Sequence, residues 1–226
     1  DIAPKEYFWG YNRMTTIRGL FAAGDGVGGS AHKFSSGSYT EGRLAGKAAV
    51  AYVYDNPAPP TPDADRMEAI KKELFAPLEV YEQSRPAVTR GEVNPNALSP
   101  KQALLRLQKI MDEYVAGQGS GYITNGPTLK RGLELLGMLK QDLPRTAAKD
   151  LHDLLRVWEV WDRYYCAEAH ARHMLFREET RWPGYYYRGD FPKLDEANWK
   201  CFTTSRYDAA KGEWTLTKRP FIQLIP

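Results

Sequence analysis

The sequence predicts an α/β unit followed by a helical bundle and a short C-terminal β-hairpin. The stretch Gly19–Gly29 reads as a short buried strand followed by a glycine-rich loop, and a helix start comes after it. Through most of residues 99–176, apolar residues recur at helical spacing. The last part of the chain alternates like two strands joined by a turn. These three patterns give the fold class α/β plus α.

The glycine-rich loop follows a segment expected to be a buried strand. It contains the spacing G-x-G-x-x-G at Gly24, Gly26 and Gly29. In the first crossover of a Rossmann fold the third glycine already lies in the helix. Here the first helix-start signal comes after Gly29, so the third glycine would still lie in the loop. That signal is the capping box formed by Ser38 and Glu41, in which each side chain bonds the backbone of the other. We therefore expect the helix to begin at Ser38.

The helix expected over residues 39–54 would let a flat ligand approach closely. Its small residues are Gly42, Ala45, Gly46, Ala48 and Ala49. Its N–H groups and positive dipole end would face whatever the loop holds, and an anionic reduced flavin suits such a site. An ordinary strand, loop and helix with a glycine turn fits the same pattern, so the motif alone leaves both interpretations open.

Prolines and glycines divide the rest of the chain. Residues 55–62 form a proline-rich linker that should be extended. A helix interrupted near Pro77 is expected over residues 65–83, with a loop over 86–98 after it. Ser99–Gln102 is a second capping box, with proline at its first helical position, and starts another helix.

Three amphipathic segments then predict a bundle. The first carries an apolar stripe at Leu104, Leu107, Met111, Tyr114 and Val115. A second helix is expected over residues 128–143, after a glycine-rich break, and the longest over 146–176. The buried side of the longest is expected at Leu151, Leu154, Leu155, Trp158 and Trp161. Residues 199–206 and 213–218 should pair as strands around a turn at 208–212.

Composition excludes several classes of protein. The net charge of +3 over 226 residues is too small to indicate nucleic-acid binding. No apolar run approaches the roughly 20 residues that a membrane span needs, so we expect a cytoplasmic protein. The two cysteines, Cys166 and Cys201, make no disulfide framework and cannot supply the about four thiolates of an iron–sulfur cluster. Any such cluster must belong to a partner.

Two ordered blocks of sequence resemble the succinate dehydrogenase/fumarate reductase flavoprotein superfamily, and more closely its adenylylsulfate (APS) reductase α subunits. The first block is Gly19–Gly29 with His32–Leu44. The second runs from Glu179 through Arg188–Pro192 to Asp195–Trp199, and includes Trp182–Tyr187. The resemblance covers essentially the whole chain.

The resemblance implies a fold, an activity and partners. Residues 1–54 would be the C-terminal edge of a Rossmann-like FAD-binding domain, 55–98 a linker with one helix, and 99–226 a helical C-terminal domain with a terminal hairpin. The whole enzyme would interconvert APS with AMP and sulfite at FAD. Electrons would pass through a ferredoxin-like β subunit with [4Fe–4S] clusters. Because no dinucleotide fingerprint precedes Gly19, we expect the main ADP-binding unit to lie in a longer protein, and this part alone not to retain FAD.

The resemblance also assigns site residues. The expected FAD contacts are Gly24, Asp25, Phe34, Ser36, Gly37, Ser38 and Tyr39. His32 is the candidate catalytic residue, because a histidine can orient an anionic sulfo group or move a proton near neutral pH. Lys33 stands where dicarboxylate enzymes of the superfamily carry an arginine, and this departure argues against a dicarboxylate substrate.

The sequence leaves two alternative functions open. A fumarate reductase or aspartate oxidase relative is the alternative enzyme. A partner-binding module is the non-enzymatic one, with its surface made of Trp182, Tyr185, Tyr186, Tyr187, Trp199 and Trp214. Cys166, His170 and His173 have a spacing that a zinc site could use, but a packed polar helix face explains them better. Arg181 and Arg188 are expected to be ion-paired structure, and no metal site is predicted.

Overall fold

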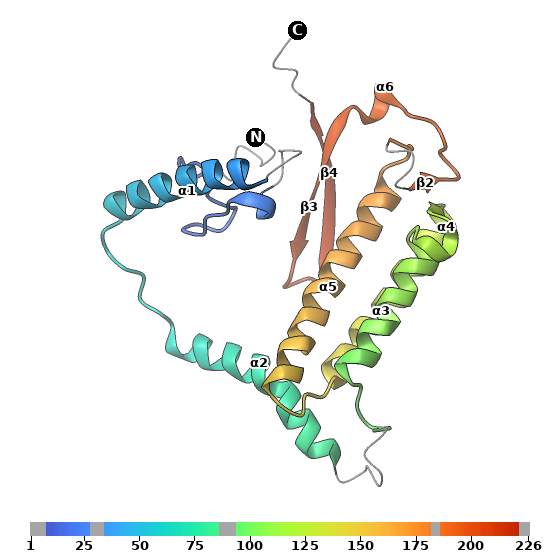
Figure 1. Cartoon of the computed structure of the whole chain (residues 1–226), viewed down its shortest axis with the longest axis horizontal. Helices are drawn as coiled ribbons and strands as arrows, with labels where there is room; N and C mark the ends of the chain where they lie inside the picture. The colour runs from blue at the N-terminus through green and yellow to red at the C-terminus, as the bar shows by residue number, and fades with distance from the viewer. Residues whose placement is uncertain (1–7, 28–33, 86–93, 182–185, 222–226) are drawn as a thin grey trace. The chain divides into compact units, whose positions relative to one another are not determined.

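The computed structural model describes residues 8–27, 34–85, 94–181 and 186–221. The chain divides into two compact units, Asp1–Asp63 and Ala64–Pro226. Figure 1 shows the elements of both. Each unit is described by itself.

In the first unit, the segment before the glycine turn packs against one long helix. This helix is α1 (Ser35–Asp55), and the tight turn before it is the 3-10 helix η2 (Gly24–Gly26). Near the C-terminal end of α1, the ring of Tyr52 contacts the rings of Tyr11 and Phe21 at centroid distances of 5.2 and 6.1 Å. These aromatic contacts fix the segment before the glycine turn to the helix.

The buried strand expected before the glycine turn is reduced to a single antiparallel bridge between Met14 and Phe21. Leu20, expected inside, is half exposed. A strand needs backbone partners for its N–H and C=O groups, and among the described residues of this unit only the chain's own short reversal supplies them. The prediction of an extended strand here was therefore wrong.

The second unit is built around the predicted helical bundle. Its helices are α3 (Pro100–Tyr114), α4 (Gly126–Asp142) and α5 (Leu151–Phe176). They enclose an apolar core that includes Leu107, Ile110, Leu129, Leu136, Leu139, Val160 and Tyr164. A Cβ added to Gly132 would lie 3.0 Å from the Cβ of Tyr114, so glycine permits the close approach of α4 to α3.

Side-chain caps set where these helices begin. The capping box at Ser99 and Gln102 is confirmed, with both reciprocal hydrogen bonds present. Asn125 caps α4 by accepting from the Thr128 N–H. Asp150 caps α5 by accepting from the Asp153 N–H, so α5 begins five residues later than predicted, after residues 146–150.

The predicted buried face of α5 is partly wrong. Leu154 is buried, but Leu151 is 68% exposed and Leu155 is 49% exposed. The residues that repeat every three or four positions from Leu154 face inward instead: Val157, Val160, Tyr164, Ala167 and Ala171. Trp161 packs at the edge of this face.

The helix α2 (Ala64–Ser84) continues through Pro77, where the sequence predicts an interruption. Figure 1 shows it bending part-way along. The Trp158 indole N–H donates to the Leu74 carbonyl at 2.9 Å, and the Ala148 N–H donates to the Pro77 carbonyl at 2.9 Å. Proline removes one helical hydrogen bond, but these contacts from α5 and the residues before it hold both sides of the bend.

Short elements complete the unit. The predicted hairpin is confirmed as β3 (Cys201–Asp208) paired antiparallel with β4 (Glu213–Pro220), and it lies beside α5. Ahead of it, α6 (Glu196–Trp199) forms one turn of helix. The two-residue strands β1 (Ile123–Thr124) and β2 (Tyr187–Arg188) pair in parallel. The 3-10 turns η4 (Gln118–Ser120) and η5 (Leu143–Arg145) lie between the bundle helices.

Candidate functional site

The glycine turn and the start of α1 lie against each other in the first unit. Gly24 and Asp25 are in η2, Phe34 immediately precedes α1, and the first turns of α1 hold Ser36, Gly37, Ser38 and Tyr39. A Cβ added to Gly24 would lie 3.2 Å from the Ser38 Oγ, so the turn and the helix are in close contact. His32 and Lys33 lie outside the described residues.

The first turn of α1 begins earlier than its sequence predicts. Ser35 is the first helical residue, and the Ser38 N–H donates to the Phe34 carbonyl at 3.1 Å. The predicted capping box at Ser38 is therefore wrong. Phe34 occupies the N-cap position, and its side chain has no acceptor with which to cap the first N–H groups.

Glu41, the expected second member of that box, bonds elsewhere. Its carboxylate accepts the Gly24 N–H at 2.8 Å, and its Oε1 lies 3.6 Å from Nη2 of Arg13. The side chain is on the buried side of α1 and is only 9% exposed. Sequence reasoning identified Glu41 only as a local cap, because a contact across 17 residues leaves no signal in a helix-start motif.

A groove opens beside the second turn of α1. It has a volume of about 480 Å³ and is lined by Ser35, Ser38, Tyr39, Gly42 and Arg43. The Tyr39 ring is 80% exposed, and Phe34 nearby is 78% exposed. A Cβ added to Gly42 would meet nothing within 4 Å.

The chemistry of this groove fits a flat anionic ring such as a flavin. The helix N-terminus supplies a positive dipole end, and Arg43 adds a cation. Exposed aromatic rings offer stacking surfaces, while Gly42 leaves room for a planar group. The residues present therefore fit FAD better than a metal ion, because the described residues that line the groove include no carboxylate, imidazole or thiolate.

No cluster of three or more histidine, cysteine or acidic side chains suited to a metal ion occurs in the described parts of the chain. On α5, the Nδ1 atom of His173 lies 3.2 Å from the Thr203 hydroxyl of β3. Burial lowers the pKa of His170, and burial together with His170 and Arg177 lowers the pKa of His173. Both imidazoles are thus held towards the neutral form by a packed helix face.

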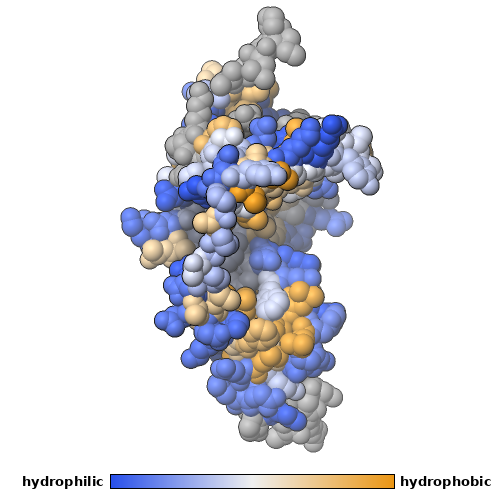
Figure 2. All heavy atoms as spheres, turned by 90° about the vertical axis from the view of Figure 1, so that its left-hand side faces the viewer, coloured by the Kyte–Doolittle hydropathy of each residue, from blue (hydrophilic) through white to orange (hydrophobic). Residues whose placement is uncertain are grey.

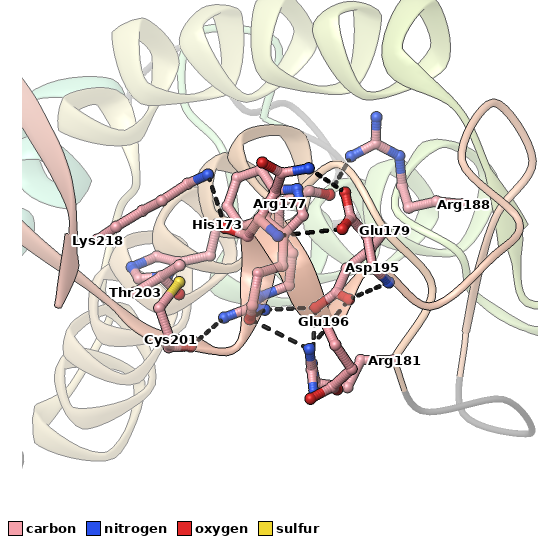
Figure 3. A network of polar contacts seen from close by, with 12 residues as sticks. His173, Arg177, Glu179, Arg181, Arg188, Asp195, Glu196, Cys201, Thr203 and Lys218 are labelled. Carbon is pink, nitrogen blue, oxygen red and sulfur yellow. Dashed lines mark hydrogen bonds and ion pairs between the residues drawn. The ribbon is translucent and has the colours of Figure 1, made fainter. Parts of the chain in front are cut away.

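The second unit holds a dense polar network at the end of α5 (Figure 3). Glu179 is fully buried and accepts from Arg177 at 2.5 Å, from Arg181 at 2.6 Å and from the Asp195 N–H at 3.0 Å. Burial alone would raise the pKa of Glu179, but the hydrogen bonds from Arg181, the Asp195 backbone and Arg177 outweigh it and lower the pKa. Arg181 also bonds Glu196 at 2.7 Å.

Arg188 is likewise structural. It is 1% exposed, pairs with Asp190 at 2.9 Å, and donates to the carbonyls of Met174 and Arg177 at the end of α5. Together with the Arg181 contacts, this confirms that both arginines are ion-paired structure. A cavity of about 500 Å³ lies beside this network, lined in part by Arg177 and Arg181. Since both guanidinium groups already bond carboxylates and carbonyls, the cavity gives no basis for a ligand site.

Of the aromatic residues considered as a partner surface, three of the four that the structure describes are buried or half-buried. Trp199 is 5% exposed and packs on Phe176 at a centroid distance of 5.6 Å. Tyr186 and Trp214 are half-buried, and Trp214 packs on the ring of Tyr207. Tyr187 is exposed, and Trp182 and Tyr185 lie outside the described residues.

Figure 2 shows mostly hydrophilic side chains on the face that it presents, with apolar side chains gathered in a patch in the lower half of the view. None of the helices in the described ranges combines the length and the apolar character that a membrane span requires.

Comparison with known proteins gives a consistent set of relatives. The APS reductase α subunit of Megalodesulfovibrio gigas is 45% identical over 216 residues, covering 96% of this chain and 32% of that protein. The structure of APS reductase from Archaeoglobus fulgidus is 52% identical with a TM-score of 0.93, covering 100% of this chain and 36% of that one. A structure of adenosine-5-phosphosulfate reductase with sulfite as a covalent adduct matches with the same values.

More distant structures share the fold. Quinol fumarate reductase of E. coli is 23% identical with a TM-score of 0.64, over 95% of this chain and 36% of that one. The chain thus spans about a third of the length of the relatives that it matches. The resemblance inferred from the two sequence blocks is confirmed, as is the fold class.

A family model also matches directly. It describes the C-terminal region of fumarate reductase flavoproteins and covers residues 105–224, from α3 through the end of the hairpin. With more than half of the sequence inside this match and APS reductase structures superposing on all of it, the chain belongs to the fumarate reductase flavoprotein C-terminal family.

Proposed function

We propose that this chain is the C-terminal part of the α subunit of an APS reductase. The observation that carries the proposal is 52% identity to APS reductase over the whole chain at a TM-score of 0.93. The relation to quinol fumarate reductase, 23% identical, shows only the fold, which many activities can share. The activity proposed for the whole enzyme is the two-electron interconversion of APS with AMP and sulfite.

In this proposal the glycine turn and the start of α1 form one wall of the FAD site. When bound, FAD supplies the two-electron redox centre. Gly24 and Asp25 would contact it from η2, and Phe34 and Ser36–Tyr39 from the start of α1. Backbone N–H groups and the positive end of the α1 dipole would stabilise negative charge on the reduced ring. The groove beside Tyr39 and Gly42 supports this assignment.

His32 and Lys33 are proposed to face the substrate. Reduction of APS breaks the bond between sulfur and the oxygen that bridges to phosphate, so that AMP keeps the oxygen and sulfite leaves. Because two electrons enter in this step, AMP and sulfite together carry more negative charge than APS. His32 would orient the sulfo group and donate a proton as that charge develops, and Lys33 would add a cation.

The proposed electron donor is a ferredoxin-like β subunit with [4Fe–4S] clusters. The chain has two cysteines, Cys166 on α5 and Cys201 on β3, fewer than the about four thiolates that such a cluster needs. The proposed location of the assembled enzyme is the cytoplasm.

The activity is tested on the full-length α subunit purified with its partner. We expect it to reduce ferricyanide only when AMP and sulfite are both present. Fumarate should not oxidise the enzyme reduced by a viologen dye. Rapid fumarate reduction, or ferricyanide reduction that does not depend on AMP, would contradict this proposal. Either result would favour an enzyme that acts on a dicarboxylate.

The role of His32 is tested in the same preparation. His32→Ala should keep FAD bound but lower AMP- and sulfite-dependent turnover by roughly 10²- to 10⁴-fold, the range for a positioned proton donor. The matched control is His152→Ala, which changes an exposed histidine on α5 and should leave turnover unchanged. Equal turnover in both variants would remove His32 from the proposed site.

A further inference from the structure

Glu41 is a buried carboxylate that joins three parts of the first unit. It lies on the second turn of α1, accepts the Gly24 N–H of the glycine turn at 2.8 Å, and lies 3.6 Å from the Arg13 guanidinium. The side chain is 9% exposed, against 31% for that of Arg13. No other acidic side chain of α1 is buried within the described residues.

Burying this carboxylate requires compensation. A carboxylate removed from water without partners is strongly destabilising, whereas a charge-assisted hydrogen bond and a nearby guanidinium offset much of that cost. Gly24 provides the hydrogen bond and Arg13 provides the charge. The contact with the glycine turn therefore contributes to making the buried position of Glu41 favourable.

The contact also sets the geometry of the turn. Gly24 has φ +69°, a conformation that glycine adopts without strain. In that conformation its N–H points at Glu41, and the turn approaches Ser38. Ser38, Glu41 and Gly42 recur at helical spacing, so the carboxylate anchors the turn next to the groove lined by Ser38 and Gly42.

We propose that Glu41 is a positioning residue of the flavin site. Its carboxylate holds the Gly24 turn at a fixed place against the start of α1, so that the two elements proposed to contact FAD are preorganised with respect to each other. This inference rests on the proposed assignment of that wall to FAD. Arg13 keeps the carboxylate from standing as an uncompensated negative charge beside an anionic ligand.

The test uses the full-length holoenzyme and four proteins: wild type, Glu41→Ala, Glu41→Gln and the control Glu73→Gln, which changes an exposed carboxylate on α2. The readouts are the FAD dissociation constant, the visible circular dichroism of bound FAD and its midpoint potential. Far-UV circular dichroism reports folding. None of these readouts requires turnover.

Glu41→Ala should weaken FAD binding by about 10-fold or more, the scale of one lost charge-assisted hydrogen bond, and change the visible dichroism of the FAD that remains. Glu41→Gln keeps an oxygen for the Gly24 N–H but loses the attraction to Arg13, so its effect should be intermediate. Glu73→Gln should match wild type.

Wild-type FAD affinity, dichroism and potential in both Glu41 variants would overturn the inference. A variant that is less stable but binds FAD with wild-type dichroism and potential would also overturn it, because Glu41 would then be structural only. If Glu41→Ala does not fold, Glu41→Gln decides between these outcomes. A wild-type protein that binds FAD without AMP- and sulfite-dependent turnover would refute the proposed function and leave this test intact.

Discussion

The glycine turn offers a sharp test because two of its glycines differ in what they tolerate. Gly24 has φ +69°, and a Cβ added there would lie 3.2 Å from the Ser38 Oγ. Gly26 has no contact within 4 Å of such a Cβ and no positive φ. Alanine at Gly24 should therefore strain the backbone and press on α1, whereas alanine at Gly26 should fit.

The expected cost of Gly24→Ala follows from the backbone. An L-residue in the left-handed region costs roughly 1–2 kcal/mol, and the tight Ser38 contact adds to it. If that cost falls on the FAD-bound state, it corresponds to about a 5- to 30-fold weaker FAD affinity. At Gly26, alanine should be neutral or stabilise the turn by up to about 1 kcal/mol, because it restricts the unfolded chain.

The measurement is the FAD dissociation constant of the full-length protein and of the two single variants, by fluorescence of released flavin. We expect a weaker constant for Gly24→Ala and a wild-type one for Gly26→Ala. Equal constants for the two variants would show that the turn is not held against α1 in the way described.

Three further predictions concern the start of α1 and the packing of the second unit. Ser38→Pro removes the N–H that donates to Phe34 and should cost about 3 kcal/mol locally, seen as loss of FAD on gel filtration; full FAD content would contradict the helix start at Ser35. Leu136→Ala, at a fully buried position, should lower the free energy of unfolding by about 2–5 kcal/mol in denaturant titration, whereas Met138→Ala, at an exposed position, should change it little. Because the pKa of Glu179 is lowered in the folded state, its carboxylate should stabilise the fold above the unfolded pKa of about 4.3 and lose that effect as the pH falls through the folded pKa. Thermal midpoints measured against pH should fall less steeply below about pH 4 in Glu179→Gln; an unchanged acid slope would contradict the pKa assignment.

Local signals predicted the bundle well. The capping box at Ser99 is a contact between residues three apart, so its geometry is encoded within a few positions and the structure reproduces it. The hairpin follows in the same way from alternation and a turn, with Gly212 at φ +69°. Such elements need no knowledge of the rest of the chain.

The start of α1 shows where local signals fail. Ser38 and Glu41 have the residue types and spacing of a capping box, yet the helix begins at Ser35 and Glu41 bonds Gly24 instead. Local spacing cannot reveal that a distant backbone N–H competes for the same carboxylate. The continuation of α2 through Pro77 has a similar cause, because contacts from Trp158 and Ala148 outweigh the local preference.

The candidate site was assigned from resemblance more than from pattern. The glycine turn alone was compatible with an ordinary turn, and the groove beside Tyr39 and Gly42 became visible only in three dimensions. The contact between Gly24 and Ser38 joins residues that the sequence places on opposite sides of a loop. The resemblance to a known family could indicate the site residues because related proteins share the packing that brings such residues together.

In the proposed APS reductase α subunit, the Gly24 turn and the start of α1 form one wall of the FAD site. The most direct test is an experimental structure of the full-length protein with FAD bound. In that structure, backbone N–H groups of Ser36 or Gly37 in the first turn of α1 should lie within hydrogen-bond distance of the flavin, about 2.7–3.2 Å, while Glu41 bonds Gly24 behind them. A flavin bound away from the N-terminus of α1 would contradict it.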